Sequence, residues 1–393
     1  MSANFDVPEE VRALVALLVA YLAVGYLLSR WGSGRLDIGF DGLVLVVRTR
    51  RFNTLIERLG LRYRRALKVF STVSVAAIVA LMVFGVYVLH DNLYKFMFRR
   101  SEASPFMPVV PGVTLGLEAL PYFAVGAFVV LVTHELAHGV VAVSEGIPVR
   151  SSGLFAAFVL FGGFVEPSEE DMARSSLLSK LRVLSVGSVA NYLTALLAAV
   201  TFSLLFAPAP GVMVEGTIEG YPAHGVLATH DVIVSINGTP VRGVDDLSAF
   251  MARTRPGDVV ELVVLRGGGE ARVSIRLAPD PRNSSKGFMG IKLAQRFTTR
   301  IPLPLHPAAV LSYYAHRAFN WVIVLCASAA VINALPVYPF DGGQMLLWIL
   351  KERGRSEGLA KAVCGAISAY FAALLVANVV LTFKLWGVRA WLP

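Results

Sequence analysis

The sequence predicts a polytopic α-helical membrane protein with about six transmembrane helices, a membrane-associated β-hairpin and an inserted β-rich domain. Of its 393 residues, 55% are hydrophobic and only 16% are charged, and the mean hydropathy is +0.64. Soluble domains carry about 25% charged residues. Apolar runs long enough to cross a bilayer recur along the chain, and one stretch, residues 210–298, instead has the alternating pattern of short strands. This composition excludes an ordinary soluble globular protein.

The net charge of +9 is explained by membrane orientation rather than by a nucleic-acid partner. The basic residues cluster beside apolar runs, and no basic stripe is interleaved with aromatic residues, so no nucleic acid is expected. The two cysteines, Cys326 and Cys364, lie inside apolar runs without the spacing of a metal site or a disulfide framework. We interpret them as packing residues.

The N-terminal part, 1–118, is expected to hold two transmembrane helices around a basic loop. The first apolar run, 12–29, has no basic start and no small-residue cleavage site, so we interpret it as a retained anchor. Residues 32–68 contain nine basic and three acidic residues, which predicts a cytoplasmic loop. Its run 43–47 is either a short strand followed by a basic amphipathic helix on the membrane surface or part of a plain basic loop. A second span is expected at about 69–89.

The third predicted span, about 119–143, carries the motif His134-Glu135-Leu136-Ala137-His138. Histidines four residues apart share one face of a helix and can bind one metal ion. Glu135 is rotated by about 100° from His134, so its carboxylate can serve a water without binding the metal itself. This is the H-E-x-x-H pattern of zinc peptidases. Ionisable side chains are costly in a bilayer unless paired or metal-bound, so the apolar setting favours function over a chance match.

Two segments after the motif are candidates for contact with a substrate. Residues 147–167 are apolar but interrupted by glycines, among them Gly162 and Gly163, and are too short for a comfortable helical span. They form either a β-hairpin that dips toward the metal or a peripheral loop. A hairpin at that depth must be buried in protein or line a water-filled cavity, because lipid cannot satisfy irregular backbone. The fourth span, about 181–206, places Asn191 in the middle of the membrane. Its amide either packs between helices or donates to a substrate carbonyl.

The stretch 210–298 predicts a soluble β-rich domain of under 100 residues inserted between spans, with an Asn237-Gly238 hairpin turn. A fifth span, about 308–332, precedes a proline-rich segment that ends in Asp341. Alone, an Asp-Gly pair is an ordinary turn. Together with the two histidines, Asp341 completes a zinc site with an open fourth position for water. A sixth span is expected at about 359–385.

The two separated motifs, together with Asn333-Ala334-Leu335-Pro336, closely resemble the site-2 protease family of intramembrane zinc metalloproteases over roughly residues 119–350. The resemblance implies Zn²⁺ as cofactor, with His134, His138 and Asp341 as its ligands. It implies that Glu135 is the catalytic general base. It also implies substrate contacts from the hairpin and from two amides: Gly162, Gly163, Asn191 and Asn333.

The chain departs from the family pattern at two positions, with Ser188 where proline is common and Phe340 where leucine is common. The inserted domain looks like a PDZ module through Tyr221-Pro222-Ala223-His224-Gly225 and 231–238, although His230 stands where glycine is usual. The expected divisions, in chain order, are an N-terminal helix pair (1–118), the first part of the protease core (119–209), the PDZ-like domain (210–298), the second part of the core (299–357) and a C-terminal transmembrane helix (358–393).

The implied function is hydrolysis of peptide bonds within or beside the transmembrane helices of single-pass membrane protein substrates. A metal transporter would explain the ligands but would leave Glu135 without a task, and the intact motifs argue against an inactive scaffold. The protein is expected in the cell membrane as a multi-pass protein. His134 lies 13 residues past Pro121, roughly 20 Å along a helix, which places the metal nearer the cytoplasmic face. The domain at 210–298 is then extracytoplasmic.

Overall fold

The computed structural model describes residues 19, 21–28, 36–41, 44–110, 113–157, 160–281, 283–301, 305–354 and 356–387. Contacts within the chain divide it into two compact units, one of residues 1–195 and 322–392 and the other of residues 196–321. The predicted first span, 12–29, lies partly outside the described residues. The described part of this span, residues 19 and 21–28, is helical.

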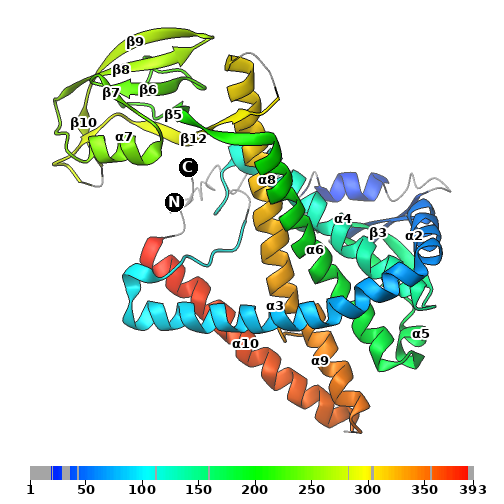
Figure 1. Ribbon diagram of the computed structural model, residues 1–393. Coiled ribbons are helices and arrows are strands. Elements are labelled where there is room, and N and C mark those ends of the chain that lie inside the picture. Colours follow the sequence, from blue (N-terminus) through cyan, green and yellow to red (C-terminus); the bar gives the residue numbers. More distant parts are fainter. Residues whose placement is uncertain are drawn as a thin grey trace, which may run out of the picture. The chain divides into compact units, whose positions relative to one another are not determined.

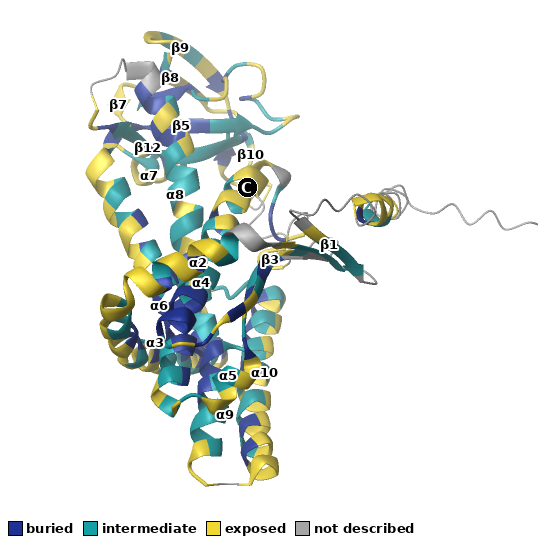
Figure 2. Cartoon of the chain, turned by 90° about the vertical axis from the view of Figure 1, so that its right-hand side faces the viewer, coloured by how far each residue is buried: buried dark blue, intermediate teal, exposed yellow. Residues whose placement is uncertain are grey.

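Five described helices are long and apolar enough to cross a membrane (Figure 1). They are α3 (Arg64–Phe98), α4 (Leu120–Ser144), α6 (Leu177–Leu205), α8 (Leu305–Ala334) and α10 (Glu357–Trp386). Exposed stretches run along α10 (Figure 2), where large apolar side chains such as Val376 and Val380 are suited to contact lipid. The spans expected from the second to the sixth are thus confirmed. Three short helices, η1 (Arg100–Glu102), η2 (Leu117–Ala119) and α5 (Glu169–Arg174), also lie in the first unit.

A four-stranded antiparallel sheet lies in the first unit, in the order β1-β2-β3-β4. Its strands are β1 (Leu36–Asp41), β2 (Val44–Thr49), β3 (Val149–Ala157) and β4 (Leu160–Pro167). The predicted hairpin at 147–167 is confirmed, and its strand β3 pairs with the strand expected at 43–47. Gly153 makes this pairing possible, because a Cβ there would collide with the Val47 carbonyl oxygen.

The basic amphipathic helix expected after β2 is α2 (Arg50–Arg62), and its apolar side packs against α4. Ile56 of α2 is buried with Val140 of α4 and Val165 of β4. Gly139 permits this close approach, since a Cβ there would lie 3.1 Å from the Ile56 side chain. The sheet and the motif helix are therefore fixed against each other through α2.

Asp341 begins a helix that the sequence analysis did not anticipate, α9 (Asp341–Glu352), where a turn was expected. An acidic residue in the first turn of a helix is stabilised by the helix dipole. Gly342 and Gly343 let this turn pack onto the preceding chain, because a Cβ on Gly342 would lie 2.6 Å from the Leu335 carbonyl oxygen. The first turn of α9 is thus held against the end of α8, and Asp341 is buried there.

The second unit contains the predicted β-rich domain, which extends from 206 to 299. Its main sheet has the order β12-β5-β6-β8-β9, with β7 paired to β6, and β10 pairs with β11. Asn237 and Gly238 have φ angles of 48° and 76°, as a tight hairpin turn requires. The elements are β5 (Phe206–Thr217), β6 (Val232–Ile236), β7 (Thr239–Pro240), α7 (Val244–Met251), β8 (Val259–Arg266), β9 (Gly269–Arg276), β10 (Ala278–Pro279), β11 (Gly287–Phe288) and β12 (Ile291–Thr299).

Within this second unit, aromatic side chains join the sheet to the helix segments that enter and leave it. Phe202 of α6 lies 5.2 Å, between ring centroids, from Phe297 of β12, and Phe297 stacks on His316 of α8 at 4.5 Å. Within the second unit, the sheet therefore packs against the parts of α6 and α8 that belong to this unit.

Candidate metal centre

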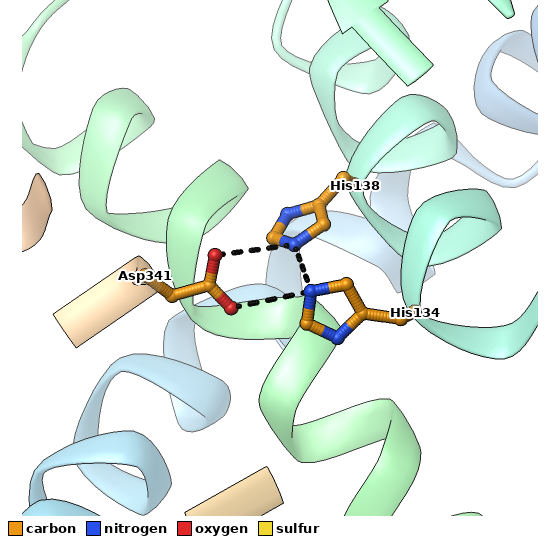
Figure 3. A group of neighbouring side chains, drawn as sticks. All are labelled: His134, His138 and Asp341. Atoms are coloured by element: carbon orange, nitrogen blue, oxygen red, sulfur yellow. Dashed lines mark hydrogen bonds and ion pairs between the residues drawn. The ribbon is translucent and has the colours of Figure 1, made fainter. Parts of the chain in front are cut away.

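His134, His138 and Asp341 converge, and among the described residues they form the only group of three or more His, Cys, Asp or Glu side chains suited to hold a metal ion. The two Nε2 atoms are 3.1 Å apart. Nε2 of His138 lies 3.4 Å from Asp341 Oδ1, and Nε2 of His134 lies 3.6 Å from Asp341 Oδ2. Figure 3 shows the two rings, from one helix, and the carboxylate turned toward one another. Two helices far apart in sequence, α4 and α9, thus supply one cluster.

The imidazole of His138 is fixed in the tautomer that a metal ligand needs. Its Nδ1 lies 2.6 Å from the carbonyl oxygen of Val183 in α6. A carbonyl can only accept, so Nδ1 carries the proton and donates, and the Nε2 lone pair of the neutral ring faces the cluster. The Nε2 atoms of the two histidines and the carboxylate oxygens of Asp341 are electron-rich atoms that face one another. The donor set therefore fits a cation of the kind that binds imidazole and carboxylate.

Gly187 provides the space for the two imidazoles, and the sequence analysis did not identify it as a site residue. A Cβ at this position on α6 would collide with His138 Nε2 and would lie 2.7 Å from His134 Cε1. A glycine inside a membrane helix is a weak signal by itself, because small residues commonly serve helix packing. Its role follows only from the position of α6 beside α4.

Ser188 and Asn191, also on α6, contact the cluster through hydrogen bonds. Ser188 Oγ donates to Asp341 Oδ2 at 3.0 Å, so the departure from the family's proline places a donor on the proposed metal ligand. The Asn191 side-chain amide lies 3.2 Å from His134 Nδ1, and both residues of α6 are fully buried. Asn191 is therefore next to a histidine of the cluster.

Glu135 stands beside the cluster and is engaged by strand β4. Its Oε2 accepts a hydrogen bond from the backbone N–H of Val165 at 2.8 Å. Gly163 of the same strand is also close, since a Cβ there would lie 3.4 Å from Glu135 Cγ. The carboxylate is thus oriented by the hairpin and is not one of the three converging groups.

The two remaining predicted residues, Gly162 and Asn333, make no contact with the cluster that the described part of the chain shows. Gly162 is buried in β4, and a Cβ there would collide with the Phe155 ring of β3, so this glycine serves the pairing of the hairpin. Asn333 is half-buried at the end of α8, and its amide has no hydrogen bond within the described part of the chain.

Comparison with known proteins gives a family match and several relatives. Residues 122–377 match the model of Peptidase family M50. An uncharacterised protein of Methanocaldococcus jannaschii is 25% identical over 324 residues, which are 80% of this chain and 80% of that protein. A membrane-bound transcription factor site-2 protease homolog of Arabidopsis thaliana is 27% identical over 201 residues, 48% of this chain and 39% of that protein. A solved PDZ domain of an SdrC-like protein from Listeria innocua is 27% identical, and the match covers 22% of this chain and 94% of that domain with a TM-score of 0.20.

Proposed function

The chain belongs to peptidase family M50, the site-2 protease family, and from this premise we propose that it is a zinc endopeptidase of the H-E-x-x-H type. Membership makes it an intramembrane metalloprotease that acts on membrane protein substrates. In the proposal, His134, His138 and Asp341 hold Zn²⁺. Glu135 is the general base.

The observation that carries the proposal is the convergence of His134, His138 and Asp341 at 3.1, 3.4 and 3.6 Å. Two imidazoles and one carboxylate are a ligand set typical of catalytic zinc, which uses three protein ligands and keeps a fourth position open. Calcium and magnesium prefer oxygen ligands alone. When bound, zinc supplies a Lewis acid that polarises a carbonyl and lowers the pKa of water.

Glu135 is placed to take a proton from the attacking water. The Val165 N–H holds Oε2 in place, so the carboxylate meets its reaction partner in one orientation. Glu135 is one residue from His134 on α4 and therefore close to the proposed metal without sharing the face of the two histidines. This separation of roles is what a base that is not a ligand requires.

The edge of β4 opposite to β3 supports a proposal for how substrate is held. In an antiparallel pair the backbone groups of alternate residues point to opposite edges. The Val165 N–H points to Glu135, so Gly163 and Phe161 present their backbone groups at the same edge, away from β3. A helical substrate has its carbonyls in internal hydrogen bonds and must unwind before it can be cut. We expect the unwound segment of a single-pass membrane protein to pair with this edge.

The proposed sidedness is supported by a basic residue that contacts one end of α4. Arg64 Nε donates to the Ser144 carbonyl oxygen at the C-terminal end of that helix, at 2.9 Å. His138 is six residues before Ser144, which is about 9 Å along a helix. The metal would therefore lie nearer the basic end, which the positive-inside rule places in the cytoplasm. The domain at 206–299 is proposed to be extracytoplasmic.

The proposed sidedness can be tested by labelling a cysteine at an exposed position of α7. Ser248 is exposed, and the two natural cysteines are buried. A membrane-impermeant maleimide should label Ser248→Cys from outside intact cells. Labelling only after the cytoplasmic face is opened would reverse the proposed topology.

The proposed activity is tested with the full chain in detergent and a membrane protein carrying one transmembrane helix. Cleavage should stop when zinc is chelated and return when zinc is restored. The fragment ends, determined by mass spectrometry, should lie within or beside the helix. Cleavage that persists at undetectable zinc would contradict the proposal.

A further inference from the structure

Thr133, the residue before the first histidine of the motif, has more close acceptors than protons. Its Oγ1 lies 2.8 Å from the Val129 carbonyl oxygen and 2.7 Å from Asn191 Oδ1. A hydroxyl has one proton to donate, and both of these oxygens can only accept. One of the two short contacts would then join two acceptors, next to an asparagine that is fully buried.

Rotating the Asn191 side-chain amide by 180° gives each of the two short contacts one proton, and the longer contact of Thr133 Oγ1 with the Val130 carbonyl oxygen, at 3.3 Å, shares the proton donated to Val129. The amide nitrogen and oxygen have nearly the same shape, so the assignment follows from the hydrogen-bond network. With Nδ2 facing Thr133, the amide donates to Oγ1, and Thr133 is free to donate to Val129. Oδ1 then takes the position 3.2 Å from His134 Nδ1 and accepts a hydrogen bond from the N–H of that ring.

This orientation determines which nitrogen of His134 can bind a metal. If Nδ1 carries the proton, the neutral ring keeps its lone pair on Nε2, the atom that faces His138 and Asp341. With the opposite amide orientation, Nδ2 donates to Nδ1 and the proton must lie on Nε2, where it blocks a metal. The two Nε2 atoms 3.1 Å apart then share a proton instead of a cation.

The two histidines are therefore oriented by different means. His138 donates to the main-chain carbonyl of Val183, which cannot exchange its acceptor for a donor. His134 contacts a side-chain amide that offers a donor at one end and an acceptor at the other. The amide contact needs another residue to select the end that faces His134.

We infer that Thr133 is a positioning residue for the metal: it orients the Asn191 amide, which in turn holds His134 in the tautomer with a free Nε2. The inference rests on the proposed function, because it takes His134 as a metal ligand. It also gives Asn191 a role different from the substrate contact implied by the family resemblance. The Asn191 oxygen is engaged by His134 and not by substrate.

The test measures zinc affinity of the full-length chain in detergent by competition with a chromogenic chelator. Thr133→Val keeps the size of the side chain and removes the hydroxyl, and we expect zinc affinity to fall about 10-fold to 100-fold, the usual effect of losing such an outer partner. Thr133→Ser keeps the hydroxyl and should bind zinc like the natural chain. If Thr133→Val does not give monodisperse protein, Thr133→Ala replaces it.

Thr194→Val is the matched control. Thr194 makes the same bond to the carbonyl four residues earlier, at 2.8 Å to Ala190, but among the described residues no side chain of the metal cluster contacts its hydroxyl. Its zinc affinity should be unchanged. Thr133→Val/Asn191→Asp should regain most of the lost affinity, because a carboxylate presents only acceptors to His134 Nδ1–H in either orientation. A merely structural role of Thr133 would not be rescued in this way.

The outcomes separate this inference from the proposed function. Zinc affinity of Thr133→Val equal to that of Thr194→Val, or failure of the aspartate to restore it, would overturn the inference. His134→Ala tests the function itself: if it keeps natural zinc affinity, the proposed metal centre is wrong. If His134→Ala loses zinc and Thr133→Val does not, the function stands and the inference fails.

Discussion

Buried polar atoms surround the proposed metal centre, whereas the inserted sheet of the second unit encloses an apolar core. At the centre, Ser188 and Asn191 are fully buried, and each has a specific partner, Asp341 or His134. In the sheet, the buried side chains are mainly aliphatic, such as Leu262 and Ile233. Buried polar groups are costly unless each is paired, while an apolar core depends mostly on filled volume. The two regions should therefore fail in different ways when mutated.

The largest expected effect is at Gly187, where Gly187→Ala places a methyl group against His138 Nε2. We expect loss of detectable bound zinc and of proteolysis, because the imidazoles have no room to keep their positions. Metal analysis of the purified protein measures this. The control is Gly365→Ala in α10, where the added Cβ would have no atom within 4 Å apart from the adjoining backbone of its own helix, and zinc should be retained. Full zinc occupancy in Gly187→Ala would show that α6 does not confine the site.

Next in size is Glu135→Gln, which keeps the shape of the side chain and removes the base. Cleavage should slow by about 100-fold to 10,000-fold, while zinc stays bound. Single-turnover cleavage and metal analysis on the same preparation give both numbers. Loss of zinc from this variant would mean that Glu135 is a ligand.

For the sheet, Leu262→Ala is expected to destabilise the fold of residues 206–299 by about 2–5 kcal/mol, because Leu262 is fully buried in its core. Hydrogen exchange followed by mass spectrometry should show faster exchange in β5, β6 and β8. Peptides from α4 should exchange as in the natural chain, and zinc should remain bound. Equal loss of protection in α4 would contradict the contrast between the two regions.

The smallest effect is expected for Ser188→Ala, which removes one hydrogen bond to Asp341 and leaves the other contacts of that carboxylate. Zinc affinity should fall about 10-fold, at the lower end for such a partner. Ser203→Ala is a suitable control on the same helix, because Ser203 bonds only to the Val200 carbonyl among the described residues. Equal zinc affinity for the two variants would show that Ser188 is not needed at the metal.

Sequence periodicity was sufficient for the motif helix and for the alternating strands of the inserted domain. Strand β1 was missed because Leu36–Asp41 contains aspartates and a glycine and becomes a strand only by pairing with β2. Helix α9 was missed because Asp341-Gly342-Gly343 resembles a turn, and its helical form depends on packing against the end of α8. Here tertiary contacts overrode local preference.

The site shows the same limit. The spacing of the two motifs and the family resemblance predicted His134, His138 and Asp341 as ligands, and the structure brings these three together. The contacts that orient them join residues far apart in sequence: Asn191 is 57 residues from His134, and Ser188 is 153 residues from Asp341. No spacing rule identifies such partners, because they depend on how α6 lies beside α4 and α9.

The most direct test of the central claim is the zinc content and activity of Asp341→Asn. The substitution keeps the shape of the side chain and removes the charge that completes the two histidines, so a site with two good ligands should hold zinc weakly. We predict loss of most bound zinc and of all detectable proteolysis, with both unchanged in Asp245→Asn, an exposed carboxylate of α7. Full zinc occupancy together with natural cleavage in Asp341→Asn would contradict the proposed metal centre.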